Sequence, residues 1–250
     1  MSAIMQDLSG MKMSHYKSTH LQGPTTWSKR VKIIEENFTI GPEARRFYKN
    51  IPNENTKSRH EYYKYCISQV NTELNIWASL GVHEGKRERK IIEYKNKYFP
   101  QLQQKYLHGF DSFQGLPSYW KPGFPKGKFD MENIPTITGC KLHIGWFSET
   151  LPVFAAENKG KTLALLHVDC DLYSSTVDIF ENLANMVVPG TIIMFDEIQG
   201  EEAHIEHEKK AFDEFVDKYK VEYEWLAWMV NASQATCVIK SINNLKGENK

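Results

Sequence analysis

Short apolar runs alternate with helix-like segments along most of this 250-residue chain. Two of these runs, at 164–168 and 191–195, are continuous rather than alternating in hydrophobicity. Strands of a parallel sheet that are buried on both faces have this pattern. Parallel neighbours must be joined by crossovers, which are usually helices. The alternation therefore predicts an α/β fold with a doubly wound, mostly parallel sheet.

The series predicts seven strands, the last two of which are antiparallel and close one edge of the sheet. We expect the strands at 74–80, 105–111, 141–147, 163–169, 191–196, 222–227 and 235–239. After a first helical segment that begins at Arg59, we expect helices at 84–98, 151–157, 172–187 and 203–220.

Residues 1–58 differ in composition from the rest, with many Ser, Thr, Asn, Gly, Pro and Lys residues and few apolar runs. We interpret them as an N-terminal arm or lid with short helices at 31–38 and 44–48. Residues 59–250 are expected to form one α/β domain, because a chain of this length with 41% hydrophobic residues can bury a full core. The Pro- and Gly-rich segment 114–125 is a second candidate lid.

Net charge and cysteine content indicate which class of partner and which cellular compartment to expect. The 31 basic and 31 acidic side chains cancel, so no net field favours nucleic acid or a membrane, and a small-molecule partner is expected. The four cysteines are scattered without C-x-x-C pairing, and we find no signal sequence or long apolar stretch. These features predict a cytoplasmic protein, and a homo-oligomer is compatible with them.

Carboxylates follow three of the expected strands: Asp111, Asp169 and the pair Asp196 and Glu197. Ligands bind at the carboxyl ends of the strands in open α/β sheets. Carboxylates gathered there repel one another and lose hydration, which a hard cation such as Mg²⁺ would relieve. Each can instead be a helix N-cap, for which Asp171 is a good candidate.

The turn 81–85 joins an expected strand to a helix. Its glycines, Gly81 and Gly85, would let the backbone approach a ligand at the helix N-terminus. The turn lacks the G-x-G-x-x-G pattern of dinucleotide-binding folds, which counts against NAD or FAD. His167 lies inside an apolar run, so we interpret it as a packed core residue rather than a metal ligand.

Three segments resemble the macrocin O-methyltransferase (TylF-type) family in content, order and spacing: GFDSFQGLP at 109–117, GWFSETLP at 145–152 and HVDCDLYSST at 167–176. The resemblance extends over residues 59–239. It implies a class I, Rossmann-like methyltransferase fold, with S-adenosylmethionine as methyl donor and Mg²⁺ as a second cofactor.

The resemblance also implies the roles of individual residues. Asp169, Asp196 and Glu197 would bind Mg²⁺, Asp171 would be the general base, and Asp111 would hold the ribose hydroxyls of the donor. The rest of the donor site would be formed by Gly81, Val82, Gly85, Ser112, Gly145, Trp146 and Phe147.

Two positions depart from the family pattern. The first strand of relatives usually ends with a glutamate two positions before the first glycine, where this chain has Ser79. Glu197 stands where many relatives carry Asp, a change that keeps the ligand type and lengthens its reach.

We therefore expect a Mg²⁺-dependent O-methyltransferase that acts on a hydroxyl of a small molecule, such as a sugar or another vicinal diol of natural-product biosynthesis. Two alternatives stay open. The sequence Asp-Cys-Asp at 169–171 also looks like the D-x-D motif of Mg²⁺- or Mn²⁺-dependent phosphatases and glycosyltransferases, although phosphatases carry it at the start of the domain. The other is a noncatalytic binding protein that retains the fold.

Overall fold

The computed structural model describes residues 29, 32–34, 36–41, 43–47, 57–230 and 232–243. Most of the expected arm, residues 1–58, therefore lies outside the described residues. The strands are β1 (Arg45–Phe47), β2 (Ile76–Leu80), β3 (Leu107–Asp111), β4 (Cys140–Ile144), β5 (Leu163–Val168), β6 (Ile192–Phe195), β7 (Glu222–Met229) and β8 (Ala235–Ser241). The helices are α3 (Lys57–Ser68), α4 (Lys86–Tyr98), α5 (Phe147–Glu157), α6 (Tyr173–Leu183), α7 (Glu202–His204) and α8 (Lys210–Tyr219). Short helical turns are η2 (Pro100–Leu102), η3 (Ala184–Met186) and the π-helical η4 (Ile205–Lys209).

The described strands form one eight-stranded sheet in the order β1-β7-β8-β6-β5-β2-β3-β4. The prediction of a doubly wound, mostly parallel α/β sheet is confirmed, because β8 alone runs against its neighbours and every other pair is parallel. The two closing strands, β7 and β8, pair antiparallel with each other as expected.

The sheet has one strand more than the seven predicted. The segment 44–48 was expected to be helical, and this prediction is wrong: Arg45–Phe47 is strand β1, which pairs parallel with β7 and takes the edge position expected for β7. Phe47 is buried and packs edge-on against Tyr62 of α3. So short a segment has little helical stability of its own, and an open sheet edge with a buried aromatic contact outweighs it.

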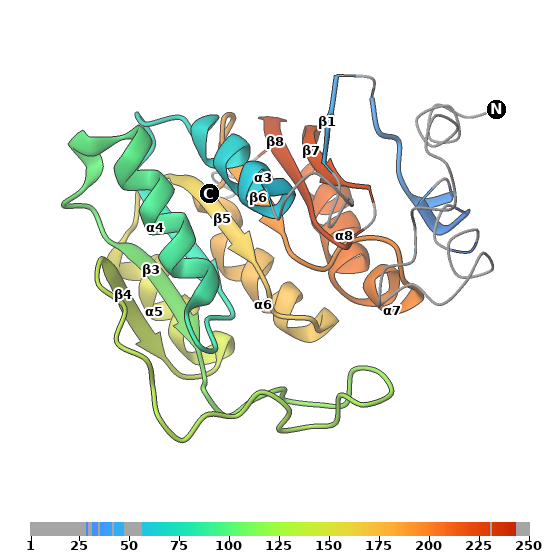
Figure 1. The fold of residues 1–250 in the computed structure, drawn as a ribbon, viewed down its shortest axis with the longest axis horizontal. Coiled ribbons are helices and arrows are strands. Elements are labelled where there is room, and N and C mark those ends of the chain that lie inside the picture. The colour runs from blue at the N-terminus through green and yellow to red at the C-terminus, as the bar shows by residue number, and fades with distance from the viewer. Residues whose placement is uncertain are drawn as a thin grey trace, which may run out of the picture.

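Helices cover both faces of the sheet (Figure 1). One face packs on α3 and α4, with Ile67 and Ile91 in its core, and the other packs on α5, α6 and α8, with Phe154 and Phe212 in its core. β5 is buried along its whole length because its residues contact both cores in turn. This confirms the interpretation of the continuous apolar runs as central strands.

The expected strand 141–147 ends earlier in the structure, at Ile144. Gly145, with φ of 144°, turns the chain, and α5 begins at Phe147. As a result, Trp146 lies in the connection between strand and helix, at the carboxyl edge of the sheet. Within the described part of the chain, no helix combines the length and apolarity that crossing a membrane requires.

Candidate active site

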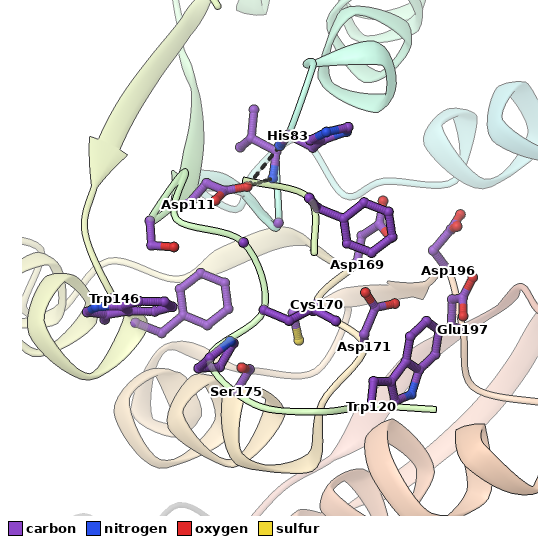
Figure 2. Close-up of a pocket in the computed structure, with 18 of the residues that line it drawn as sticks. His83, Asp111, Trp120, Trp146, Asp169, Cys170, Asp171, Ser175, Asp196 and Glu197 are labelled. Atoms are coloured by element: carbon purple, nitrogen blue, oxygen red, sulfur yellow. Dashed lines mark hydrogen bonds between the residues drawn. The ribbon is translucent and has the colours of Figure 1, made fainter. Parts of the chain in front are cut away.

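A pocket of about 670 Å³ opens at the carboxyl ends of β2, β3, β5 and β6 (Figure 2). The strand order reverses between β2 and β5, so the pocket lies at the switch point of the sheet, where α/β folds bind ligands. Its volume lies within the roughly 300–1,000 Å³ typical of small-molecule sites. The predicted site residues that line it are Gly81, Val82, Asp111, Ser112, Gly145, Trp146, Phe147, Asp169, Asp171, Asp196 and Glu197.

Asp111, the last residue of β3, organises one end of the pocket. Its Oδ2 accepts hydrogen bonds from the backbone N–H groups of Val82 and His83, both at 2.8 Å (Figure 2). Its Oδ1 accepts one from the N–H of Phe113 at 2.7 Å. A carboxylate has about four lone-pair sites in all, so Asp111 can still accept a hydrogen bond from a ligand.

The two glycines of the turn 81–85 have different surroundings. Gly81 has φ of +93°, and a Cβ there would lie 1.8 Å from the backbone oxygen of Asp169, so a glycine is needed for β2 and β5 to end side by side. A Cβ at Gly85 would lie 2.3 Å from Cδ1 of Ile137. Gly85 is the N-cap of α4 and is not among the described residues that line the pocket, so its visible role is in packing.

Trp146 lies at the opposite end of the pocket from Asp196 and Glu197 (Figure 2). The backbone N–H of Gly145 donates to the carbonyl of Asp111 at 3.0 Å, which joins the start of this segment to β3. An indole on a pocket wall offers a flat apolar face against which an aromatic base can stack.

The acidic end of the pocket is built by two neighbouring strands. Asp169 follows β5 and Asp196 follows β6, and the pairing of Val168 with Phe195 places the two aspartates side by side. Burial, followed by the charge of Asp196, raises the pKa of Asp169 well above its usual value. Burial, followed by the charges of Glu197 and Asp196, raises the pKa of Asp171 to about 8. A carboxyl with a pKa near neutrality is suited to general acid–base chemistry.

Asp171 has a left-handed backbone with φ of 65°, which is uncommon for a residue other than glycine. Glu208, on η4, stabilises this conformation through hydrogen bonds to the backbone. Its Oε1 accepts hydrogen bonds from the backbone N–H groups of Cys170, at 3.2 Å, and of Asp171, at 3.1 Å. Glu208 is fully buried, and the sequence pattern did not predict its role.

Arg87, in the first turn of α4, is a further site residue that the sequence pattern did not predict. Its Nη2 donates to Oδ2 of Asp196 at 3.1 Å, and its Nε donates to Oδ1 of Asp196 at 3.4 Å. The same Nε lies 3.8 Å from Oδ2 of Asp169. Burial by itself would raise the pKa of Asp196, but the guanidinium outweighs it and lowers that pKa to about 2.

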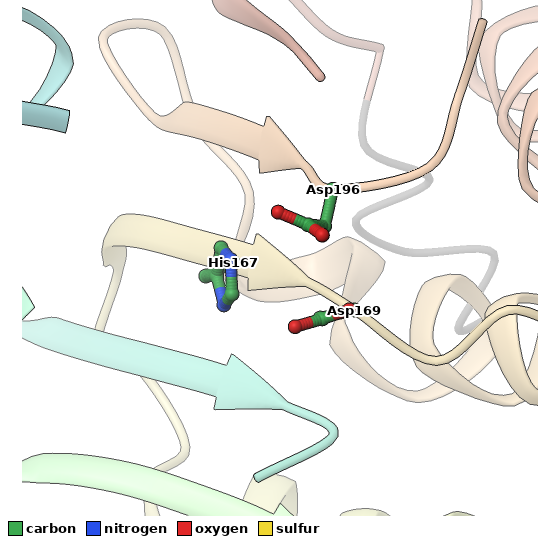
Figure 3. A group of neighbouring side chains, drawn as sticks. All are labelled: His167, Asp169 and Asp196. Carbon is green, nitrogen blue, oxygen red and sulfur yellow. The ribbon is translucent and has the colours of Figure 1, made fainter. Parts of the chain in front are cut away.

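The donor atoms of His167, Asp169 and Asp196 lie within 4.8 Å of one another, as one metal ion would require (Figure 3). Glu197 is outside this group, and its Oε2 lies 3.1 Å from Nε2 of His204. Burial lowers the pKa of His167 to about 4, and its Nδ1 lies 2.8 Å from Oγ of Ser79. The carboxylates of Asp169 and Asp196 are the oxygen donors that suit Mg²⁺.

Ser79 contacts a carboxylate that comes from another element. Its Oγ donates to Oε1 of Glu88 at 2.7 Å. Glu88 lies on α4 and is fully buried, and burial raises its pKa to about 7. A carboxyl group therefore lies beside Ser79, where the family resemblance leads us to expect a glutamate, but α4 supplies it instead of β2.

The segment 114–125, which was predicted to be a lid, contributes one wall of the pocket through Trp120, Lys121 and Phe124 among others. The ring of Trp120 stacks on that of His204, with 6.1 Å between centroids. Nζ of Lys121 lies 4.0 Å from Oε2 of Glu197, and the lysine also pairs with Glu201. The loop thus brings aromatic and basic groups to the acidic end of the pocket.

Residues 127–229 match the family model of macrocin-O-methyltransferase (TylF). The chain is similar to the calicheamicin methyltransferase CalS11, with a TM-score of 0.61 and 19% identity, over 92% of this chain and 97% of that chain. It is also similar to the O-methyltransferase NovP, with a TM-score of 0.52 and 21% identity, over 73% of this chain and 79% of that chain. No curated protein matches the chain.

An apo structure of CalS11, described as TDP-rhamnose 3'-O-methyltransferase, gives a TM-score of 0.55 at 19% identity, over 87% of this chain and 95% of that chain. At such identities the solved structures establish the fold. The family match runs from residue 127, just after the predicted lid segment, through β7 and includes the acidic residues from Asp169 to Glu197. It confirms the resemblance that the sequence motifs carry and favours methyl transfer over the D-x-D alternative. Over residues 127–229 the chain matches the TylF macrocin-O-methyltransferase family, and its fold is that of the solved O-methyltransferases CalS11 and NovP.

Proposed function

We propose that this methyltransferase acts on a small molecule with neighbouring hydroxyl groups, such as a sugar. The observation that carries the proposal is the position of Asp171, a pocket-lining carboxyl with a pKa raised to about 8. The residues predicted to hold the donor, apart from Gly85, line the same pocket. The description of CalS11 as a TDP-rhamnose 3'-O-methyltransferase supports a sugar hydroxyl as the acceptor.

The donor would lie along the turn 81–85 and the ends of β3 and β4. Asp111 has lone pairs left for the ribose hydroxyls after it accepts its three backbone hydrogen bonds. Trp146 and Phe147 give the adenine an aromatic wall, and Ser112 and Gly145 border it. The sulfonium and its methyl group would then point toward the acidic end.

Asp171 would act as the general base. It takes the proton of the acceptor hydroxyl while the oxygen attacks the methyl carbon in line with the departing sulfur. The C–O bond forms as the C–S bond breaks, and S-adenosylhomocysteine leaves with the electron pair on its sulfur. The pocket would hold the two reactants in the alignment that this displacement needs.

Mg²⁺ is part of this proposal, with Asp169 and Asp196 as its ligands and Glu197 as a third candidate. The convergence of donor atoms at Asp169 and Asp196 supports the first two residues. Glu197 lines the pocket but contacts His204, so its participation depends on a different side-chain rotamer. When bound, the ion would act as a Lewis acid that lowers the pKa of the acceptor hydroxyls.

The test is a measurement of S-adenosylhomocysteine release from S-adenosylmethionine in the presence of TDP-rhamnose or of a catechol, with Mg²⁺ or with EDTA. We expect turnover with at least one diol and its loss in EDTA. A protein that binds the donor but methylates neither diol would contradict the proposed acceptor class. Full turnover in EDTA would contradict the Mg²⁺ part alone.

A further inference from the structure

We propose that Arg87 is a built-in cation that competes with Mg²⁺ for Asp169 and Asp196. Its guanidinium contacts both aspartates, and its side chain must move away before the ion can bind. This inference rests on the proposed function in one respect: it takes Asp169 and Asp196 to be the metal ligands.

The geometry places Arg87 on the atoms that an ion would use. Two of its nitrogens contact the two carboxylate oxygens of Asp196, at 3.1 and 3.4 Å, as a fork. Its Nε lies 3.8 Å from Asp169, so the same group is shared between both aspartates. A guanidinium in this arrangement matches the planar geometry of a carboxylate and forms charge-assisted hydrogen bonds.

The burial of the three side chains makes the contact strong. Only 5% of the Asp196 side chain is exposed, compared with 24% for Asp169 and 29% for Arg87. Solvent screens partly buried charges weakly, so a cation close by stabilises the ionised form of each aspartate. Either Arg87 or a divalent ion can meet this need, but a guanidinium and Mg²⁺ repel each other at such short distances.

The position of Arg87 on α4 allows its side chain to move away from the two aspartates. It follows the N-cap Gly85 by two residues, lies in the first turn of the helix and lines the open pocket. An arginine side chain has enough length and rotamer freedom to swing into the pocket while its backbone stays helical. Binding of Mg²⁺ is therefore coupled to a rotamer change of one residue, and the coupling weakens the affinity for the ion.

The experiment measures binding of Mn²⁺, a probe with the same preference for oxygen ligands, by electron spin resonance. It compares the parent protein with Arg87→Met, which keeps a similar stem but no charge. Lys90→Met is the matched control, since Lys90 is an exposed basic residue of the same helix that pairs with Glu93. We expect Arg87→Met to bind Mn²⁺ more tightly than the parent by roughly 5- to 150-fold, the usual range of coupling between linked equilibria, and Lys90→Met to match the parent.

Equal affinities of the parent and Arg87→Met would overturn the competition. Loss of binding in Asp196→Asn would in that case still support the metal site of the proposed function. Absence of Mn²⁺ binding in both proteins would overturn the competition and the metal part of the proposed function together. Binding of S-adenosylhomocysteine reports separately on the methyltransferase assignment.

If Arg87→Met does not fold, Arg87→Lys replaces it. A lysine cannot form the two-nitrogen contact with Asp196, so we expect this variant to bind Mn²⁺ more tightly than the parent. Unchanged binding would contradict the proposal.

Discussion

At the scale of single residues, the acidic end of the pocket depends on the environment of each carboxyl. Asp196 is held ionised by Arg87, whereas burial and like charges raise the pKa values of Asp169 and Asp171. Neighbouring carboxyls with pKa values pushed apart are a common sign that the groups have different chemical roles. Asp171 is the member suited to take up a proton.

We predict that Asp171→Asn lowers kcat by roughly 10²- to 10⁴-fold, the usual contribution of a general base. The amide has a similar shape but cannot accept the proton, so donor affinity should stay within a few-fold of the parent. Steady-state kinetics with a diol acceptor and calorimetry with S-adenosylhomocysteine measure the two effects. The exposed Asp217 of α8 provides the control variant Asp217→Asn. Near-normal turnover of Asp171→Asn would show that Asp171 is not the general base and has only a structural role.

A second prediction concerns Glu88 and the pH dependence of folding stability. Its pKa rises from 4.5 to about 7 in the folded protein because the group is buried. The folded state therefore binds the proton more tightly, and Glu88 lowers the stability progressively as pH rises from 4.5 to 7. We compare the free energy of unfolding of Glu88→Gln with that of the parent. Between pH 4.5 and pH 8, this difference should change in favour of the variant by up to about 3 kcal/mol.

Urea unfolding of the parent, Glu88→Gln and the control Glu93→Gln at several pH values checks this prediction. Glu93 is an exposed glutamate of the same helix, so its variant should follow the parent at every pH. A difference between Glu88→Gln and the parent that does not change with pH would show that Glu88 keeps an ordinary pKa.

The sequence could predict the carboxylates because each follows an apolar run, and that pattern places a residue at the end of a strand. It could not predict Arg87 or Glu88. These are consecutive residues of a strongly polar helix, and the direction of each side chain depends on how α4 packs on the sheet. Such packing is a property of the assembled layers and leaves no local signal in the sequence.

At the scale of elements, the π-helical turn η4 positions the loop after β5. Such turns often occur at functional sites. Glu208, on η4, accepts from two successive backbone N–H groups of that loop, and the neighbouring His207 accepts from the N–H of Tyr173 through its Nδ1 at 3.0 Å. Together these contacts fix the backbone from Cys170 to Tyr173, which includes the left-handed Asp171.

We predict that Glu208→Ala lowers kcat by up to about 10²-fold through misplacement of the base, with little change in the affinity for S-adenosylhomocysteine. Glu208→Gln should restore most of the rate, because an amide oxygen can accept the same two hydrogen bonds. Kinetics of both variants, with thermal unfolding as a check on folding, make the comparison. If glutamine were as harmful as alanine in a folded protein, Glu208 would act through its charge and not through position.

The elements that the sequence predicted best are those with long apolar or periodic patterns, such as β5 and α4. β1 was missed because it has three residues and its partner β7 lies far along the chain. The start of α5 was placed too late because Trp146 and Phe147 read as the continuation of an apolar strand. In both cases a tertiary contact or a single glycine decided the structure against the local pattern.

At the scale of the whole molecule, the doubly wound order brings residues from distant parts of the chain to one pocket. Asp111 at the end of β3 and Asp171 after β5 are separated by β4, α5 and β5 in sequence, yet both line the pocket at the switch point. We propose that this pocket binds the methyl donor at the Asp111 end and activates the acceptor at the Asp171 end.

The most direct test is a calorimetric titration of the parent, Asp111→Ala and Asp171→Asn with S-adenosylhomocysteine. We predict that the parent binds with a Kd of roughly 1 μM to 1 mM, the range of typical enzyme affinities. Asp111→Ala should bind at least about tenfold more weakly, since hydrogen bonds to a charged group contribute about 1.5–3 kcal/mol. Asp171→Asn should bind like the parent. Absence of binding by the parent at millimolar concentration, or unchanged affinity in Asp111→Ala, would contradict the account.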